Sequence, residues 1–291
     1  MSRKLRTRNH SVVLNRSKGG DAGITFFLVF LGLFMFLPLF YTVLQSLKPL
    51  DELFYFPPRF FVSHPTMGNY SSLFTLMQYS WVPFSRYVFN TVLMAAGGVF
   101  GNLVFSSLAA YALAKIDFPG NKFFFQVIQK SLMFTPAIVA TLQFIIYSKL
   151  KWVDTYLAII VPAWATALGL YLMKQFMDTN VTTEMLESAR LDGARELRIF
   201  WTIAMPMVKP AWLTLIIYSF KDLWQMQGST YIHSEQLKTM GYSIATVGTG
   251  TVARSAVAAA GTVFIMIVPI LVFIITQSNI IETMGSSGMK D

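Results

Sequence analysis

The stretch TTEMLESARLDGARELRIFWTIAMP, residues 182–206, separates two apolar parts of the chain and is too polar to cross a bilayer. Its pattern is helical. Thr182 can cap the first N–H groups, Glu184 lies in the first turn, where the helix dipole favours an acid, and Pro206 ends the run. The stretch therefore predicts a helical segment that lies outside the membrane.

This segment has one apolar or small face and one charged face. Helical spacing groups Thr, Leu, Ala, Gly, Leu, Phe and Ala at positions 182, 186, 189, 193, 197, 200 and 204. Two interpretations are open: an amphipathic helix that only steadies a membrane bundle, or a docking element for a partner. Gly193 either divides the stretch into two short helices, if its φ is positive, or allows close contact with another backbone beside Ala189.

On both sides of this segment in the sequence, the chain is strongly apolar. It has 291 residues, of which 54% are hydrophobic and only 13% are charged, about half the roughly 25% expected of a soluble domain. A bilayer core about 30 Å thick needs roughly 20 apolar residues in a helix. Long apolar runs occupy residues 24–47, 88–114, 123–148, 155–173 and 255–281, and a weaker run at 207–227 is interrupted by Lys221 and Asp222. We therefore expect an all-α membrane protein with six transmembrane helices.

The expected organisation is one transmembrane domain over residues 24–281, with a polar loop at 174–209 and two tails, 1–23 and 282–291. The basic start is similar to that of a signal peptide. However, the apolar run after it is longer than a signal h-region and no small-residue cleavage site follows it, so we expect an uncleaved first span.

Lysine and arginine indicate which side each loop occupies. With the N-terminus inside, fourteen of them lie on the cytoplasmic side and seven on the other. Such an excess favours cytoplasmic N- and C-termini. The net charge of +9 is then a matter of topology, and we expect no nucleic-acid partner.

Several kinds of chemistry are excluded. The chain has no cysteine and only three scattered histidines, so we expect no metal site. It has no H-E-x-x-H, no G-x-S-x-G and no pair of acids within a span, which argues against an intramembrane enzyme and predicts no catalytic residues. Charge rings or carbonyl filters typical of a channel are not seen. No Gly-Lys pair occurs, so no phosphate loop is present, and energy for any uphill transport must come from a partner.

A resemblance to a known family rests on residues 187–189, Gly193 and residues 203–206. Their types and spacing resemble the EAA loop of permease subunits in bacterial binding-protein-dependent ABC importers, whose pattern is Glu-Ala-Ala, then Gly, then Ile-x-Leu-Pro. Ser188 replaces the middle alanine and Met205 the leucine. Further short stretches resemble the carbohydrate branch, the maltose-type permeases: SLKP at 46–49, Asn90 with Thr91, AYALAKIDFPG at 110–120, TYLA at 155–158, LDGA at 191–194 and LKT at 237–239.

The resemblance implies a type I importer permease fold with the EAA coupling helix between spans four and five, in the bacterial cytoplasmic membrane. It implies import of a carbohydrate by alternating access, and an oligosaccharide is the carbohydrate we expect. The implied partners are a second homologous permease, two cytoplasmic ATPase subunits that use ATP and Mg²⁺, and an extracytoplasmic solute-binding protein; this chain itself binds no cofactor. Another solute, such as a polyol, glycerol phosphate or a lipid-linked sugar, is an open alternative, because the EAA loop does not encode the cargo.

The coupling residues follow from the same resemblance. Apolar and small side chains are expected to fill a groove on the ATPase, and Glu187 and Arg190 to pair with charges at its rim. The interpretation as an ordinary solvated face remains open for each position. The full set is Leu186, Glu187, Ser188, Ala189, Arg190, Asp192, Gly193, Ala194, Leu197 and Pro206.

A substrate path is harder to predict. Sugar sites combine aromatic faces with amides or acids, and charges within spans are functional candidates by default. The candidates are Asn90, Gln143, Trp164, Lys221, Asp222, Trp224 and Gln225. For each of them an ordinary role in the core or in an interfacial aromatic belt is the competing interpretation. The outer segments 49–87 and 228–254 are candidates for contact with a binding protein.

Overall fold

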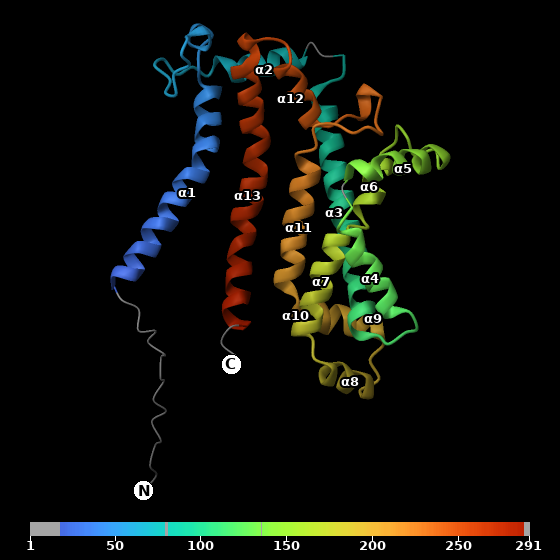
Figure 1. Ribbon diagram of the computed structural model, residues 1–291. Helices are drawn as coiled ribbons and strands as arrows, with labels where there is room; N and C mark the ends of the chain where they lie inside the picture. The colour runs from blue at the N-terminus through green and yellow to red at the C-terminus, as the bar shows by residue number, and fades with distance from the viewer. Residues whose placement is uncertain (1–17, 79–80, 135, 288–291) are drawn as a thin grey trace.

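The computed structural model describes residues 18–78, 81–134 and 136–287, and these residues form helices and connecting loops without any strand (Figure 1). Residues 1–17 and 288–291, which hold most of one predicted tail and the end of the other, lie outside the described part. The elements in chain order are α1 (Lys18–Ser46), η1 (Asp51–Phe54), α2 (Gly68–Gln78), α3 (Phe84–Lys115), α4 (Asn121–Ser131), α5 (Pro136–Lys149), α6 (Leu157–Ala163), α7 (Ala167–Asn180), α8 (Thr183–Leu191), α9 (Glu196–Ile199), η2 (Phe200–Ala204), α10 (Met205–Met207), α11 (Lys209–Trp224), η3 (Glu235–Leu237), α12 (Met240–Gly248), η4 (Val252–Arg254) and α13 (Ser255–Ser287).

Among the described residues, four stretches are long and apolar enough to cross a membrane: Gly19–Ser46, Phe84–Lys115, Leu157–Asn180 and Val252–Gln277. A fifth is obtained if Glu196–Met207 and Lys209–Trp224, which meet at 83°, count as one broken span. The run predicted as the third span is divided into α4 and α5, and α5 lies crosswise to α3 (Figure 1). Pro136 begins α5, and a proline has no N–H with which to continue a preceding helix. The count of six therefore stays a prediction.

Helix α3 is the centre of the bundle and packs along α6, α7 and α11. Small residues allow this close approach. A Cβ atom on Gly101 would lie 2.0 Å from the indole ring of Trp164, whose Nε1 donates a hydrogen bond to the carbonyl of Gly97 at 2.9 Å. Glycine is therefore required at position 101 for the joint between α6 and α7 to lie against α3.

The buried apolar side chains form two clusters along α3. One lies toward the start of α3 and includes Met94, Leu223 and Met240. The other lies toward its end and includes Met173 and Phe200. The first cluster holds the loop 228–254 against α3, and the second holds the stretch 182–206.

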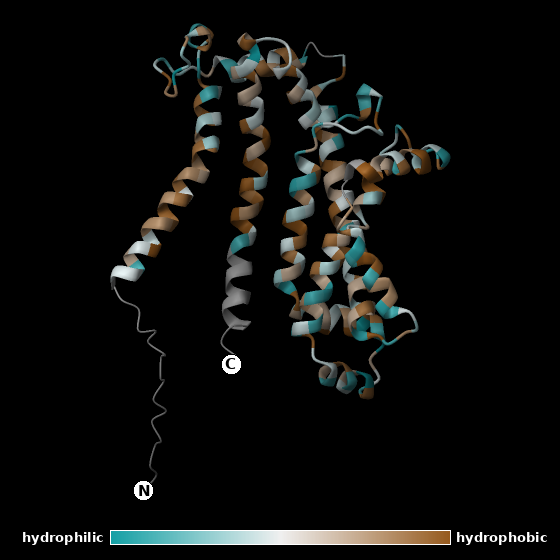
Figure 2. Cartoon of the chain, in the orientation of Figure 1, coloured by the Kyte–Doolittle hydropathy of each residue, from teal (hydrophilic) through white to brown (hydrophobic). Residues whose placement is uncertain are grey.

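Helix α1 is apolar on all sides, and its residues from Gly19 to Leu39 are exposed (Figure 2). Phe26, for example, is 74% exposed. In water this much apolar surface would be strongly unfavourable, whereas hydrocarbon is a compatible surrounding. The exposure fits a helix that faces lipid or a partner chain.

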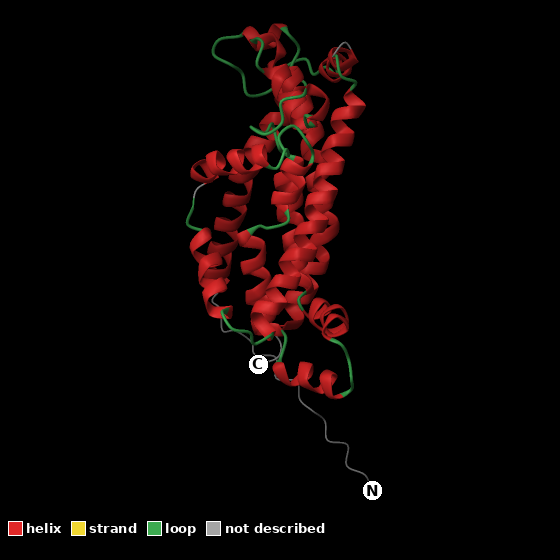
Figure 3. Ribbon diagram, turned by 90° about the vertical axis from the view of Figure 1, so that its right-hand side faces the viewer, coloured by secondary structure: helices red, strands yellow, loops and turns green. Residues whose placement is uncertain are grey.

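The two ends of the bundle differ. The start of α1, the last turns of α13 and the loop with α8 lie at one end, and α2, η3 and α12 lie at the other (Figure 1). Helix α8 runs crosswise beyond the ends of the long helices, as the turned view also shows (Figure 3). α13 continues through Ser287, past the predicted boundary of the C-terminal tail at residue 281.

Candidate functional site

The polar stretch 182–206 is broken at Gly193, which has φ +80°. The N–H of Gly193 donates to the carbonyl of Arg190 and the N–H of Ala194 donates to that of Ala189, both at 3.0 Å. This pair of bonds is the Schellman ending of an α-helix, which favours glycine at the left-handed position. Among the described residues, no atom outside the immediate neighbours lies within 4 Å of a Cβ built on Gly193. The first of the two alternatives is therefore confirmed: the glycine divides the stretch, and it does not serve close backbone contact.

One of two expectations about the ends of this stretch is wrong. Thr182 occupies the N-cap position of α8, but its side chain makes no capping hydrogen bond to the described residues. Pro206 lies one residue before the end of the continuous helical stretch Glu196–Met207, so the run ends beside it as expected. This stretch passes through the π-helical turn η2 and α10, and the chain then bends sharply into α11.

The apolar face is also distributed differently from the prediction, because the chain changes direction at Gly193. Leu186 is 1% exposed and packs within the cluster around Phe200, so it attaches α8 to its own chain and is not presented to a partner. Leu197 is 65% exposed. Leu191, which the helical spacing assigned to no apolar face, is 89% exposed at the tip of α8.

An ion pair holds the two halves of the loop together. Arg190 Nε donates to Glu196 Oε1 at 2.6 Å, and the Tyr111 hydroxyl of α3 donates to Glu196 Oε2 at 2.9 Å. The hydrogen bond from Arg190 is the main cause that lowers the pKa of Glu196, against the opposing effect of burial. Glu196 thus connects α8, α9 and α3. The role of Glu196 could not be predicted from the sequence, because Tyr111 is 85 residues away and the spacing of six between Arg190 and Glu196 is not helical.

The remaining predicted coupling residues divide into two groups. Glu187, Ser188 and Asp192 are exposed. Ala189 and Ala194 are half-buried against the cluster around Phe200. Arg190 already has a partner in Glu196, so its predicted pairing with a charge on another protein would have to compete with this bond. The exposed surface of the loop is therefore formed by α8's outer side and the apolar side chains of Leu191 and Leu197.

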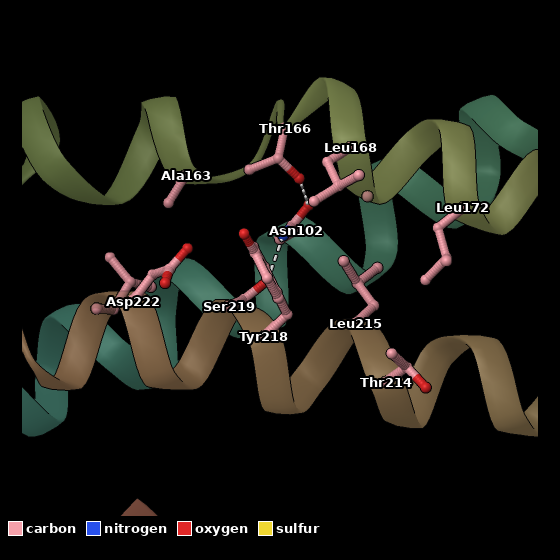
Figure 4. A pocket seen from close by; sticks show the side chains of 12 residues that line it. Asn102, Ala163, Thr166, Leu168, Leu172, Thr214, Leu215, Tyr218, Ser219 and Asp222 are labelled. Carbon is pink, nitrogen blue, oxygen red and sulfur yellow. Dashed lines mark hydrogen bonds between the residues drawn. The ribbon is translucent and has the colours of Figure 1, made fainter. Parts of the chain in front are cut away.

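A cavity of about 200 Å³ lies between α11, α3 and the joint of α6 with α7 (Figure 4). Asn102 is 1% exposed and its side-chain amide makes three hydrogen bonds: it donates to Ser219 Oγ at 2.5 Å and accepts from the hydroxyls of Ser106 and Thr166. Asp222 lines the same cavity. Thr214, Tyr218 and Asp222 follow one another at helical spacing on α11, so one side of this helix offers polar groups to a cavity that Ala163 and four leucines also line.

The predicted substrate residues are not brought together. Asn90 is fully buried; its amide nitrogen donates to the carbonyls of Gln236 and Lys238, at 2.8 and 2.9 Å, and its oxygen accepts from the Tyr156 hydroxyl at 2.7 Å. It therefore has no free group for a sugar. Its neighbour Thr91 accepts the N–H of Met240 at 2.8 Å. Asn90 and Thr91 fasten the loop 228–254 to α3.

Both tryptophans of the predicted path have structural roles. Trp164 stacks on Phe105 with centroids 5.2 Å apart and, as described, packs on Gly101. Trp224 is 7% exposed, stacks on Phe220 and donates from Nε1 to the carbonyl of Ile265 on α13 at 3.0 Å. These rings fill the core, which is the competing interpretation that the sequence left open.

The other three predicted residues lie in different places. Gln143 accepts from the Tyr231 hydroxyl at 3.0 Å and lines a wide hollow of about 620 Å³ between α5, α6 and the loop 228–254. Lys221 and Gln225 line a hollow on the α13 side of α11. Adjacent side chains on a helix point in different directions, so Lys221 and Asp222 face separate hollows. Only Asp222 reaches the cavity of Figure 4. Within the described residues no group of three His, Cys, Asp or Glu could hold a metal ion.

The chain matches a family model over residues 102–284, and the family is described as the binding-protein-dependent transport system inner membrane component. Among curated proteins, the arabinooligosaccharides transport system permease protein AraQ of Halalkalibacterium halodurans is 28% identical, with 91% of this chain and 93% of that protein covered. The sn-glycerol-3-phosphate transport system permease protein UgpE of Yersinia enterocolitica is 34% identical over a shorter region, 55% of this chain and 53% of that protein.

A solved structure shares the fold. It is the crystal structure of a bacterial ABC transporter involved in the import of the acidic polysaccharide alginate, with a TM-score of 0.74, 21% identity, and coverage of 90% of this chain and 98% of that one. The agreement extends over nearly the whole of both chains.

Proposed function

The chain belongs to the family of binding-protein-dependent transport system inner membrane components, and on this premise we propose that it is the permease subunit of an ATP-driven importer of an oligosaccharide. The similarity to the arabinooligosaccharide permease over nine-tenths of both chains supports the cargo class. On this proposal the chain works by alternating access with a second permease, receives its substrate from an extracytoplasmic binding protein, and has no ATP site of its own.

The proposed energy input is the loop with α8. One observation carries this part: a helix that lies crosswise beyond the long helices ends in a leucine, Leu191, with 89% of its surface exposed. An apolar side chain at the tip of a polar projecting helix suits insertion into a groove on a partner. Because the proposal puts two cytoplasmic ATPase subunits there, it also puts both termini in the cytoplasm, in agreement with the excess of lysine and arginine.

On this proposal, a movement of α8 is transmitted to α3 and α11 through the contacts of the loop. Leu186 attaches α8 to the buried cluster, and Glu196 connects Arg190 of the loop to Tyr111 of α3. Farther along the chain, α9, η2 and α10 run directly into α11, whose polar side lines the cavity. ATP-driven closure of the ATPase pair would thus reach two helices that border the cavity.

Copurification tests whether the tip of α8 binds the ATPase subunits. Leu191→Asp places a charge where the proposal puts an apolar groove, and Leu191→Met is the matched control because it keeps an apolar side chain of similar volume. We expect the aspartate variant to fold normally but to lose the ATPase subunits on purification, and the methionine variant to retain them. Full retention of the ATPases and of substrate-stimulated hydrolysis in the aspartate variant would contradict the proposal.

The cargo on this proposal is a neutral sugar. The lining of the cavity includes the carboxylate of Asp222 and, among the described residues, neither lysine nor arginine. An anionic solute would favour cations there. A second candidate, glycerol phosphate, is favoured by the 34% identity to the glycerol phosphate permease. Uptake measured with the cognate binding protein separates the two: stimulation by neutral oligosaccharides alone supports the first, and stimulation by glycerol phosphate alone replaces it with the second.

A further inference from the structure

The loop FYFPPRFF, residues 54–61, exposes an unusual number of aromatic rings; we call it the aromatic loop. Phe56 is 96% exposed and Phe61 is 68% exposed, and Phe54, Tyr55 and Phe60 are also exposed. The loop follows η1 at the end of the bundle opposite α8 (Figure 1). Isolated exposed apolar residues need no explanation, but five within eight residues form a patch that marks an interaction surface.

The base of the aromatic loop is fastened by buried polar groups. Glu52 is 4% exposed, and its carboxylate accepts the N–H groups of Ser63 and His64, at distances from 2.8 to 3.1 Å. These hydrogen bonds outweigh the effect of burial and lower the pKa of Glu52. Lys48 is 3% exposed and donates from Nζ to the carbonyl of Arg59 at 2.6 Å. The exposed rings are therefore held in place by a rigid base, and their exposure is not the consequence of a loose segment.

The aromatic loop also folds back along α1. The ring of Phe60 lies 5.3 Å from that of Tyr41, and Lys48 Nζ lies 5.5 Å from the same Tyr41 ring. Tyr41 is five residues before the end of α1 at Ser46, which corresponds to about 7.5 Å along the helix axis at 1.5 Å per residue. Because α1 is apolar on all sides up to this region, a membrane crossed by α1 would place Phe60 at the depth where the hydrocarbon core gives way to headgroups.

The chemistry of the aromatic loop suits that boundary. Aromatic rings collect at membrane interfaces, where they meet both apolar chains and polar headgroups. The guanidinium of Arg59 lies 4.9 Å from the centroid of the Tyr55 ring and is exposed, so it is available to lipid phosphates. The loop projects beside α1 at the edge of the bundle, on the side away from α3 and α11 (Figure 1). A binding protein that feeds the central cavity would instead be centred over α3 and α11, which border that cavity.

We propose that the aromatic loop is an interfacial anchor, which inserts Phe56, Phe61 and their neighbours into the headgroup region of the outer leaflet beside α1. The occupant is a lipid surface of phosphate-bearing headgroups. The anchor supports α1, which packs mainly against α13 and exposes most of its own surface. This proposal depends on the membrane location of α1 and not on the transported solute.

The absence of cysteine from the chain makes a site-specific depth measurement direct. Three single-cysteine variants, each labelled with an environment-sensitive fluorophore, are reconstituted as the full chain in nanodiscs of phosphatidylethanolamine and phosphatidylglycerol. Phe56→Cys reports on the aromatic loop. Phe30→Cys, in the exposed middle of α1, is the control for the hydrocarbon, and Thr249→Cys, an exposed residue after α12, is the control for water.

We expect nitroxide-labelled lipid headgroups to quench the label at position 56 several-fold more than the label at position 249. Aqueous iodide should quench position 56 less than position 249 and more than position 30. The proposal is overturned if position 56 responds to both quenchers as position 249 does. It is also overturned if position 56 becomes protected only after the second permease or the binding protein is added, since a protein surface would then be the occupant.

Discussion

The two ends of α3 hold their loops by opposite means. At the start of the helix, Asn90 and Thr91 are completely buried and bind the backbone of the outer loop. At the other end, Tyr111 reaches Glu196, whose side chain is 46% exposed and whose other partner, Arg190, is also partly exposed. Buried bonds are expensive to break, and exposed ion pairs are weak. On the orientation proposed above, the comparison indicates a rigid outer cap, residues 228–254, and an inner loop, residues 182–206, that can rearrange when a partner binds.

The largest effect is expected where the cap is fastened. Asn90→Ala removes three hydrogen bonds and leaves the Tyr156 hydroxyl and two backbone carbonyls without that partner, which should lower the free energy of unfolding by about 3 kcal/mol. Thermal unfolding of the purified protein in detergent measures this. Gln236→Ala is the matched control, because Asn90 binds only the backbone of Gln236, and it should unfold like the unmodified protein. Equal stability of both variants would contradict the rigid cap.

A smaller effect is expected at the break in the inner loop. Gly193→Val forces a β-branched residue to φ +80°, at a cost of roughly 1–2 kcal/mol, although no neighbouring atom obstructs the side chain. We expect the loop to distort and ATPase copurification to fall. Gly193→Asn is the control, since asparagine tolerates this conformation, and it should retain the ATPases. Equal loss in both variants would show that size, and not the backbone angle, matters here.

A structural feature could be predicted from the sequence only where neighbouring residues in the sequence determine it. Apolar length located α1, α3 and α13, and the short-range pattern around Gly193 located both the loop and its break. The roles of Asn90, Trp164 and Trp224 were not visible, because an amide or an indole in an apolar run has the same local pattern whether it binds a sugar or fills the core. Only the distant partners, such as the carbonyl of Ile265, decide this.

The broken helices were equally hidden. Hydropathy averages over a window, so residues 123–148 gave one span although the chain changes direction between α4 and α5. The bend of 83° before α11 lies between Pro206 and Pro210, a local signal that an average of hydropathy does not register. Glu196 was missed for another reason: its two partners meet only after the chain has turned at Gly193.

The smallest effect is expected from the ion pair of the inner loop. The pKa of Glu196 is lowered in the folded protein, so its stabilisation is fully present above the ordinary carboxyl pKa of about 4.3 and is lost as the pH falls through the lowered value. Both side chains are over one-third exposed, which limits the effect to about 1 kcal/mol or less. Glu196→Gln should therefore be slightly less stable than the unmodified protein at pH 7 in thermal unfolding, and the difference should shrink as the pH falls below about 4.3. A difference that grows on acidification would contradict the ion pair.

The central claim, that the tip of α8 faces the cytoplasm and is covered by an ATPase subunit, is tested most directly by a single cysteine at position 191. Leu191→Cys is treated with a membrane-impermeant maleimide in intact cells and in inside-out vesicles, with and without the ATPase subunits. The account predicts no labelling in cells, rapid labelling in vesicles stripped of the ATPases, and at least tenfold slower labelling once they rebind. Rapid labelling in intact cells, or equal rates with and without the ATPases, would contradict it.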